Sequence, residues 1–503
     1  MLFSWQMLGQ GFAQALTPEN LLFALIGSLV GTLVGVLPGI GPTSAIAILL
    51  PLTTVLQPIP ALIMMAAIYY GAQYGGSTTA IMVNIPGEAS SVPTTLDGYQ
   101  MAKQGRSGPA LAISAIASFG AGTISMIGLT FFAPLLAGVA LAFGPPEYFA
   151  LMFMALSLIV GLSGRALLKG FMAMCIGLLV SMIGLDPITG SARLTFGLVD
   201  LMGGVNFISV IIGLFAIGEV LVNVERDLDF IYTSTIKKLM PTWMELRSCI
   251  VTIVRATGIG FAMGLLPGCS PAVTTFVAYD LEKRTSKHPE RFGTGVIQGV
   301  AAPEAANNAT SQSGFIPLFA FGIPAGPALA VMLGGFMMYG LQPGPRLFQE
   351  NPQLVWSVIA SMYVGNAMLL ILNLPLVRLW VKIAVIPFPI LGPLIVLFSV
   401  IGSYSVRYQL FDVWVALLFG VVGYLMRKFG IPMAPAVLAT ILAQMLETNL
   451  KQSLAISHGD YTIFFTRPIA IVFMLLGMAV ILRGLWVRYR GVELELTDEG
   501  GEA

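Results

Sequence analysis

The feature that most constrains this chain is a proline-glycine break that occurs twice inside apolar sequence. Residues 35–44 read Gly-Val-Leu-Pro-Gly-Ile-Gly-Pro-Thr-Ser, and residues 264–273 read Gly-Leu-Leu-Pro-Gly-Cys-Ser-Pro-Ala-Val. Proline lacks an N–H donor and glycine adopts backbone angles that other residues avoid, so each stretch interrupts a helix. Broken backbone at membrane depth is tolerated only where protein or a watered cavity satisfies its polar groups. A repeated pair of such breaks therefore predicts a binding site of the kind that transporters use.

The composition places the chain in a membrane. Of its 503 residues, 56% are hydrophobic and 10% are charged. Apolar runs such as Ala110–Phe143 and Ile469–Leu485 reach or exceed the roughly 17 to 25 residues of a membrane-spanning helix. We expect an all-α polytopic membrane protein with about twelve spans. Met1–Asn20 lacks the basic start and cleavage site of a signal peptide, so the first span is expected to be retained.

Charge, cysteine content and motifs argue against several functions. A net charge of +1 offers no basic surface for nucleic acid. Cys175, Cys249 and Cys269 stand far apart in the sequence, and the chain has only two histidines. Neither a disulfide framework nor a metal site is therefore predicted. The chain lacks GxxxxGK(S/T), HExxH and GxSxG, so we predict no catalytic residues and no enzyme. An intramembrane enzyme acting on a lipid-borne substrate, or a structural scaffold, is the alternative.

Several features recur in the same order, which predicts an internal duplication. Four pairs of positions keep similar separations: Gly35 and Gly264 (229 residues), Pro86 and Pro324 (238), Pro134 and Pro375 (241), and Gly161 and Gly402 (241). We expect two inverted structural repeats with broken or re-entrant helices. The predicted units are a lead-in (1–20), a first membrane repeat (21–223), a polar linker (224–248), a second membrane repeat (249–490) and a polar tail (491–503).

The distribution of Lys and Arg predicts how the chain lies in the membrane. Lys237, Lys238 and Arg247 precede the second break, and four further basic residues follow it between Lys283 and Arg291. Short loops rich in Lys and Arg favour the cytoplasmic side, so residues 249–281 are expected to enter the membrane and return as a hairpin. The first hairpin would then enter from the opposite face.

The restarted helices are predicted to bind an anion. A helix that restarts after a break exposes unpaired N–H groups and the positive end of its dipole. Thr43 and Ser44 are candidate caps of the first restarted helix, and Ser270 of the second. Two such ends would hold a carboxylate without a buried Lys or Arg, whereas kinked, closely packed helices are the structural alternative. The predicted substrate-binding residues are Gly39, Gly41, Thr43, Ser44, Asn84, Gly268, Ser270, Asn307, Asn308 and Thr310.

A second pair of breaks, near Pro86 and Pro324, lies beside polar sequence that could bind the coupling ion. Carboxylates at membrane depth are costly and by default functional, so Glu88 and Glu304 are predicted to couple ions, together with Ser90 and Ser311. An interfacial carboxylate or a polar surface loop is the alternative. No cofactor is predicted, and the coupling ion is H⁺ or a transient Na⁺. Asp186, Glu219 and Asp412 are expected to be structural or solvated. Arg255 is expected to extend to the membrane interface, and contact with a substrate carboxylate is the alternative.

These motifs resemble the TctA family, the large permease subunits of the tripartite tricarboxylate transporters. The resemblance runs from Leu21 to the last span and rests on the following stretches: Gly35-Val-Leu-Pro-Gly-Ile-Gly-Pro-Thr, Tyr69-Tyr-Gly-Ala-Gln-Tyr-Gly-Gly-Ser-Thr-Thr, Asn84-Ile-Pro-Gly-Glu-Ala-Ser-Ser-Val, Gly264-Leu-Leu-Pro-Gly, Glu282-Lys-Arg, Gly299-Val-Ala-Ala-Pro-Glu-Ala-Ala-Asn-Asn-Ala, and Gly340-Leu-Gln-Pro-Gly-Pro. The two halves differ in places. For example, Ala325 stands in the second half where the first has Gly87.

The resemblance implies a multi-pass protein of the bacterial inner membrane. It implies a secondary active transporter, a symporter that takes up citrate or related di- and tricarboxylates with a proton or sodium gradient. The implied partners are a small membrane subunit with about four helices and a periplasmic solute-binding protein. The particular carboxylate, the coupling ion and the stoichiometry are left open.

Overall fold

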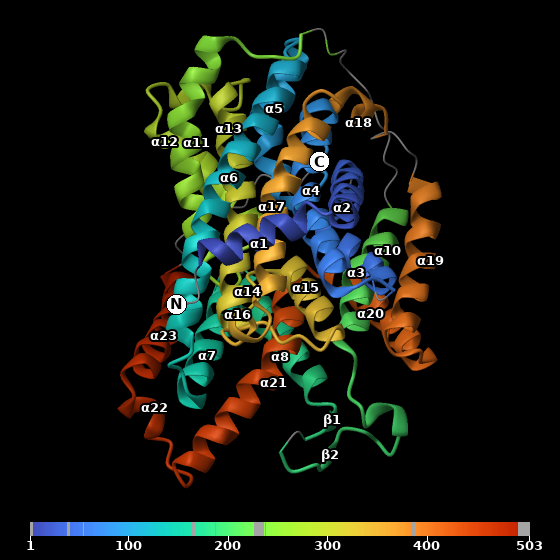
Figure 1. Cartoon of the computed structure of the whole chain (residues 1–503), viewed down its shortest axis with the longest axis vertical. Coiled ribbons are helices and arrows are strands. Elements are labelled where there is room, and N and C mark those ends of the chain that lie inside the picture. The colour runs from blue at the N-terminus through green and yellow to red at the C-terminus, as the bar shows by residue number, and fades with distance from the viewer. Residues whose placement is uncertain are drawn as a thin grey trace.

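The computed structural model describes residues 4–37, 41–53, 55–161, 166–186, 188–225, 236, 238–383 and 388–490, and these are mainly helical (Figure 1). The first half contains α1 (Trp5–Ala15), α2 (Pro18–Val36), α3 (Gly41–Thr53), α4 (Pro58–Val83), η1 (Ala89–Ser91), α5 (Val92–Lys103), α6 (Ser107–Ala140), α7 (Pro145–Gly161), α8 (Leu167–Ser181), the short antiparallel strands β1 (Gly184–Leu185) and β2 (Ala192–Arg193), η3 (Val199–Leu201), α9 (Phe207–Ile211), η4 (Ile212–Ile217) and α10 (Gly218–Val224).

The second half is built in the same way from helices. It contains α11 (Trp243–Gly264), α12 (Pro271–Thr285), η5 (Pro289–Arg291), α13 (Ile297–Ser313), α14 (Phe315–Phe321), α15 (Pro327–Met338), α16 (Leu347–Glu350), α17 (Pro352–Asn373), α18 (Val377–Ile383), α19 (Phe388–Arg407), α20 (Leu410–Lys428), α21 (Met433–Ile456), α22 (Ile463–Thr466) and α23 (Pro468–Arg490).

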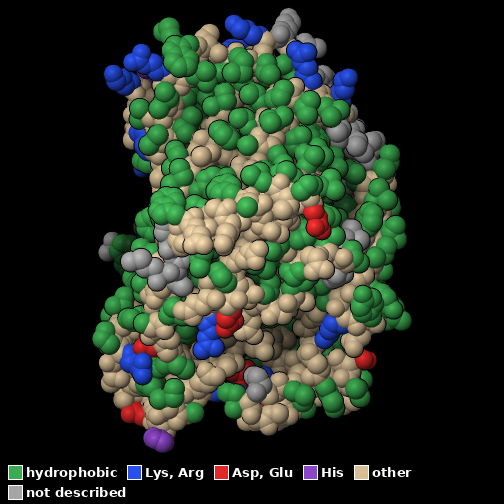
Figure 2. All heavy atoms as spheres, viewed as in Figure 1, with side chains coloured by type: hydrophobic (Ala, Val, Ile, Leu, Met, Phe, Trp, Pro, Cys, Tyr) green, Lys and Arg blue, Asp and Glu red, His purple; other side chains and the backbone are tan. Residues whose placement is uncertain are grey.

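Among the described residues, 8 helices are long and apolar enough to cross a membrane. They are Pro18–Val36, Ser107–Ala140, Phe207–Val224, Trp243–Gly264, Pro352–Asn373, Pro389–Arg407, Leu410–Lys428 and Pro468–Trp486. Figure 2 shows a largely apolar middle of the molecule, with Lys and Arg at its upper end and charges of both signs at its lower end. The chain is therefore an all-α, multi-pass membrane protein. The larger number of spans stays a prediction, because helices such as Pro145–Gly161 and Leu167–Ser181 are shorter.

Helix α2 approaches α4 closely because glycines face it. A Cβ atom at Gly31 would lie 2.5 Å from the carbonyl oxygen of Ile68, and one at Gly35 would lie 2.2 Å from that of Ala72. Small residues let membrane helices pack backbone to backbone, where dispersion forces replace the hydrophobic effect as the driving force. Helix α4 is buried along almost its whole length as a result.

Helix α11 packs on α13 in the same way in the second half. A Cβ atom at Gly260 would lie 2.6 Å from the Ala306 carbonyl oxygen, and one at Gly264 would lie 2.6 Å from that of Thr310. Each of these four positions follows its first-half counterpart by the 229 or 238 residues that separate the sequence motifs. The two halves thus share these contacts. Whether the halves are inverted relative to one another stays a prediction.

Replacing Gly260 with alanine should separate α11 from α13. The added methyl would clash with backbone that cannot rotate away, so we expect a loss of roughly 1 to 3 kcal/mol of stability. Gly258, on the same helix, is the matched control because a Cβ atom there would meet nothing within 4 Å. Thermal unfolding in detergent should show a lower midpoint for Gly260→Ala alone. Equal midpoints for the two variants would contradict the close packing.

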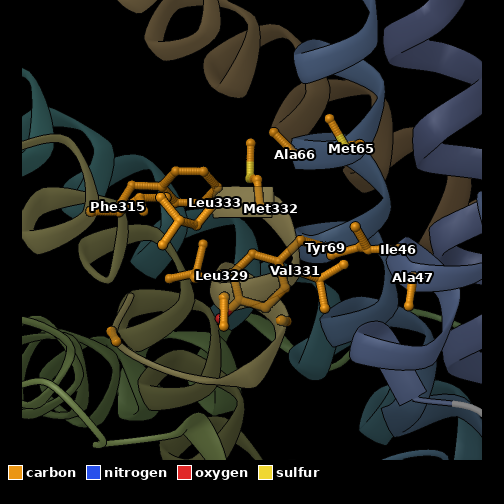
Figure 3. Packing of buried hydrophobic residues seen from close by; sticks show 14 of the residues in the cluster. Ile46, Ala47, Met65, Ala66, Tyr69, Phe315, Leu329, Val331, Met332 and Leu333 are labelled. Atoms are coloured by element: carbon orange, nitrogen blue, oxygen red, sulfur yellow. The ribbon is translucent and has the colours of Figure 1, made fainter. Parts of the chain in front are cut away.

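One part of the larger apolar core lies where α3, α4, α14 and α15 meet. Figure 3 shows Ile46 of α3, Met65 and Tyr69 of α4, and Met332 of α15 gathered with Phe315 of α14. The rings of Tyr69 and Phe315 are 6.0 Å apart between centroids. This core supports α3 and α15 just beyond their first residues, so it fixes the direction of both helix starts.

Some of the predicted boundaries between units differ from the helix boundaries in the structure. Helix α11 begins at Trp243, inside the stretch expected to be a linker, because Thr242 and Glu245 form a capping box. The Thr242 hydroxyl accepts from the Glu245 amide at 3.3 Å, and the Glu245 carboxylate accepts from the Thr242 amide at 2.8 Å. Residues 226–235 and 237 of that stretch, and the tail 491–503, lie outside the described residues.

Candidate functional site

The described residues form a pocket with a volume of about 550 Å³. It falls within the range of roughly 300 to 1,000 Å³ that is typical of small-molecule sites. Both halves of the chain line it. Its lining residues are Gly41, Pro42, Thr43, Ser44, Tyr69, Gln73, Ile85, Pro86, Gly87, Glu88, Ala89, Ser90, Phe215, Glu219, Asn223, Ser270, Pro271, Ala272, Gly326, Pro327, Ala328 and Arg427.

Three helices begin at the wall of this pocket. They are α3 at Gly41, α12 at Pro271 and α15 at Pro327, and the first residues of each belong to the lining. The first N–H groups of a helix lack intrahelical partners, and the helix dipole adds positive charge at that end. The three starts together make the pocket suitable for an anion, and a carboxylate needs the same N–H donors as a phosphate.

A carboxylate, Glu88, stands in the same wall and is held by polar neighbours. The Ser90 hydroxyl donates to Glu88 Oε1 at 2.5 Å, and the Asn307 amide donates to the same oxygen at 3.3 Å. Ser90 comes from η1, whereas Asn307 comes from α13 in the other half of the sequence. Glu88 therefore connects the pocket to the buried helix α13.

The carboxylate of Glu304 is fully buried in a cage of hydroxyls. Ser77 donates to Oε2 at 2.5 Å and Ser114 donates to the same oxygen at 3.1 Å, while Thr94 donates to Oε1. Ser118 lies 3.5 Å from Oε2. These hydroxyls come from α4, α5 and α6. Glu304 does not line the pocket, but it lies one helical turn from Asn307, which contacts Glu88.

An ion pair in the pocket was missed from the sequence. Glu219 and Arg427 form a salt bridge and both line the pocket, where the Asn223 amide also donates to Glu219 at 3.1 Å. The sequence predicted Glu219 to be a solvated or structural residue at a span end, and its ion pair agrees with a structural role. The pairing itself was not predicted, because it depends on how α10 and α20 pack together and bring the partly buried Arg427 into the pocket wall.

The π-helical segment η4 could not be anticipated either. It spans Ile212–Ile217 and places Phe215 in the pocket lining. The sequence there is uniformly apolar and carries neither proline nor a polar break. π-Helical turns are rare and occur often at functional sites, because the extra residue redirects side chains.

The structure brings many of the predicted residues together. Gly41, Thr43, Ser44, Glu88, Ser90 and Ser270 line the pocket. Asn307 contacts the pocket through Glu88. Gly39 lies outside the described residues. The alternative of a polar surface loop around residues 303–313 is ruled out, since α13 is a continuous helix whose side chains are buried almost throughout.

Other predicted residues point away from the pocket. Asn308 donates to the Glu304 carbonyl at 3.3 Å, and Thr310 donates to the Gly260 carbonyl at 3.1 Å, so both serve helix packing. Ser311 donates to the Asn307 carbonyl at 2.9 Å. Asn84 ends α4 in a left-handed conformation at φ 60° and is exposed.

Gly268 has a structural role at the second break. Its φ is +86°, and its amide donates to the Ala325 carbonyl at 2.9 Å. This bond joins the residues just before α12 to those just before α15. In the first half, a Cβ atom at Gly87 would lie 1.9 Å from the Gly35 carbonyl oxygen, which explains why alanine fits at 325 but not at 87.

The remaining charged residues of interest are paired away from the pocket. Arg255 lies 3.0 Å from Glu282 in a salt bridge that joins α11 to α12, and Asp412 pairs with Arg407. Asp186 lies in the loop after α8. There Lys451 and the backbone amides of the following turn hold the pKa of Asp186 well below its usual range. A structural role was expected for Asp186 and Asp412, whereas the pairing of Arg255 with Glu282 was not predicted.

Among the described residues, no three His, Cys, Asp or Glu side chains are grouped so as to hold a metal ion. The fold and the pocket together define a multi-pass membrane protein with a pocket, lined by three helix starts, between its two halves. The model of the tripartite tricarboxylate transporter TctA family matches residues 21–438. The chain belongs to this family, so it is the large membrane subunit of a tripartite tricarboxylate transporter and not an enzyme.

Two relatives come from Agrobacterium vitis. The "uncharacterized 52.8 kDa protein in TAR-I ttuC' 3'region" is 46% identical over 481 residues, which cover 95% of each chain. The "uncharacterized protein in TAR-II ttuC' 3'region" is 44% identical over 226 residues, which cover 45% of this chain and 93% of the relative. No solved structure matches the chain.

Proposed function

We propose that this chain is the permease of a binding-protein-dependent secondary transporter, which imports citrate or related di- and tricarboxylates with an ion gradient. The observation that carries the proposal is the meeting of three helix starts in one pocket. Two carboxylates of a substrate could each bind one positive helix end. In the salt bridge, Arg427 neutralises Glu219, one of the two carboxylates in the pocket lining, and so reduces repulsion of an anionic substrate.

The proposed coupling residues are the two carboxylates that α13 connects. Glu88 lines the pocket, and Glu304 of α13 is buried. Asn307, one turn after Glu304 on α13, donates to Glu88. An intramembrane carboxylate takes up a proton or pairs with a cation because an uncompensated charge is costly there. Either ion would make this chain a symporter that uses a proton or sodium gradient.

Membership of a tripartite family supports the remaining features of the proposal. The partners are a small membrane subunit with about four helices and a periplasmic solute-binding protein that delivers the carboxylate. The location is the bacterial inner membrane. The matched glycine contacts of α2 with α4 and of α11 with α13 support two repeats, which we propose are inverted.

The experiment that tests this function is uptake into proteoliposomes that hold the chain, the small subunit and a loaded binding protein. Labelled di- and tricarboxylates are supplied under an imposed sodium or proton gradient. We expect gradient-driven uptake of at least one of them. We also expect about tenfold slower uptake by Asn307→Ala, because Glu88 loses a hydrogen-bond donor.

Gly258→Ala is the control, since a Cβ atom there meets nothing within 4 Å. Its uptake should equal that of the wild type. If no carboxylate is taken up under either gradient, with all three proteins folded and present, the proposed substrate class is wrong. If Asn307→Ala transports normally, the contact between α13 and Glu88 plays no part in transport.

A further inference from the structure

The side chain of Asp97 on α5 is fully buried and lies outside the pocket lining. Its Oδ1 accepts from the backbone amides of Gly293, Gly295 and Val296 at 2.9, 2.8 and 2.8 Å. Its Oδ2 accepts from the Tyr279 hydroxyl at 2.8 Å. These donors all belong to the second half of the sequence, whereas Asp97 belongs to the first. One buried carboxylate therefore joins the two halves.

The three amides point at one oxygen because two glycines shape the segment before α13. Gly293 and Gly295 have φ values of +87° and +106°, in a region that favours glycine. Neighbouring amides in such a turn form a concavity that binds an anion. Val296 directly precedes α13, so Asp97 also places its carboxylate at the positive end of this helix. The carboxylate thus fixes the point at which α13 begins.

The first turn of α13 packs directly on Asp97. A Cβ atom at Gly299 would lie 2.1 Å from Asp97 Oδ2, so this glycine lets the helix backbone approach the carboxylate. Asn307 lies about two turns further along α13 and donates to Glu88 in the pocket wall. Because a helix moves as a stiff rod, its placement at Asp97 decides whether Asn307 meets Glu88.

The remaining donor, Tyr279, belongs to α12, which also reaches the pocket. This helix begins at Pro271, and Ser270 before it lines the pocket. On the first-half side, α5 follows η1 directly, and Ser90 of η1 lines the pocket together with Glu88. The bond from Tyr279 to α5 therefore sets how one helix start lies relative to the wall that carries Glu88.

We propose that Asp97 is a positioning residue for the pocket, which aligns the start of α12 and the donor Asn307 with Glu88 across the seam between the two halves. The inference rests on the proposed function. A displaced helix start loses affinity for an anion, because its N–H groups must lie within hydrogen-bond distance. Loss of these bonds weakens substrate binding more than it slows the movement of bound substrate.

The first measurement is the reactivity of the native Cys269 thiol, which directly precedes Ser270 at the start of α12 and is 2% exposed. The purified full chain in detergent is treated with N-ethylmaleimide, and each labelled cysteine is quantified by mass spectrometry of its peptide. Labelling of a buried thiol follows local opening of its surroundings. In Asp97→Ala and Tyr279→Phe, we expect Cys269 to be labelled about tenfold faster or more.

Cys249 is the internal reference for this measurement. It is fully buried on α11, and Glu282 at the far end of α12 is held to α11 by Thr252 at 2.8 Å and by Arg255 at 3.0 Å. A shift at the start of α12 should therefore leave the labelling of Cys249 unchanged. General unfolding would expose both thiols.

Two further variants separate positioning from other effects. Asp97→Asn keeps an oxygen for the three amides, and its amide nitrogen can donate to the Tyr279 hydroxyl, so wild-type labelling of Cys269 is expected. Tyr99→Phe is the matched control on α5. Its ring lies 4.6 Å from the Lys103 ammonium, a contact that phenylalanine keeps, so labelling should again equal that of the wild type.

Citrate binding and citrate uptake are then measured on the same variants. Binding is followed as the rise of the unfolding midpoint with citrate concentration, and the maximal rate of uptake is measured in proteoliposomes with both partners. Tyr279→Phe should raise the citrate concentration for half the effect about tenfold and leave the maximal rate within about twofold of the wild type. A lower maximal rate at an unchanged half-effect concentration would mean a merely structural contact and would overturn the positioning role.

The outcomes also distinguish this proposal from the proposed function. Wild-type labelling of Cys269 in both Asp97→Ala and Tyr279→Phe, in a chain that takes up a carboxylate, would reject the positioning role and keep the proposed function. Faster labelling of Cys269 alone, in a chain that takes up no carboxylate under either gradient, would keep the placement of α12 by Asp97 and reject the proposed function. Tyr279→Phe keeps the test decisive if Asp97→Ala does not fold.

Discussion

Gradient-driven uptake is expected to fall roughly 10- to 100-fold when Glu304 is replaced by glutamine. The variant keeps the size of the side chain and removes its charge. Four hydroxyls from three helices surround the carboxylate. A neutral amide can neither take up a proton nor balance a cation, so the chain would lose the charge that couples transport to the gradient.

The stability of Glu304→Gln should change less than its transport. One amide oxygen still accepts from Ser77 or Ser114, whereas alanine would leave the hydroxyls without an acceptor, at roughly 1 to 3 kcal/mol for each unpaired group. Gln312→Leu is the matched control on α13, since both amide atoms of the buried Gln312 lack partners. Its uptake should stay near that of the wild type.

Initial rates of uptake under a fixed gradient measure this effect, with protein amounts normalised by quantitative blotting of the liposomes. A second assay follows substrate exchange without a gradient, which needs the pocket but no net movement of the coupling ion. We expect exchange to be retained by Glu304→Gln. Full gradient-driven uptake by this variant would show that Glu304 has no part in coupling.

The second large effect concerns the salt bridge in the pocket. Arg427→Met should raise the substrate concentration for half-maximal uptake about 100-fold. The variant leaves Glu219 unpaired in the lining, where it repels a substrate carboxylate. Two unit charges about 5 Å apart repel each other by ~3 kcal/mol at an effective dielectric constant of about 20, and this energy corresponds to a factor of about 100 in affinity.

The double variant Glu219→Met with Arg427→Met distinguishes repulsion from a direct role of Arg427. If the arginine only neutralises Glu219, the double variant should recover most of the lost affinity. A double variant as weak as Arg427→Met would mean that the guanidinium itself binds the substrate. Concentration series of labelled substrate in the proteoliposome assay give both values, and the maximal rate reports any general damage to folding.

The sequence was informative where local backbone chemistry decides the structure. Helices restart at Gly41 and at Pro271, next to the repeated Pro-Gly breaks, because the proline and glycine of each break interrupt the preceding helix. Thr43, Ser44 and Ser270 therefore lie at the pocket as predicted. The family, the helical fold class and the position of Glu88 in the pocket wall could all be predicted from such motifs.

The sequence was uninformative where packing between distant helices decides the structure. Helix α13 is buried on all sides, so no apolar stripe shows that Asn307 faces Glu88 while Asn308 and Thr310 do not. Glu219 and Arg427 lie 208 residues apart and in charged span ends, where a solvated position is the usual outcome. Their meeting depends on how α10 and α20 pack.

The bond from the Gly268 amide to the Ala325 carbonyl limits how the molecule can move. It fastens the start of α12 to the start of α15, two of the three helix ends that face the pocket. A motion that opened the pocket by pulling these two ends apart would break the bond and expose two polar groups at membrane depth. The two helices are therefore expected to tilt together as one rigid unit.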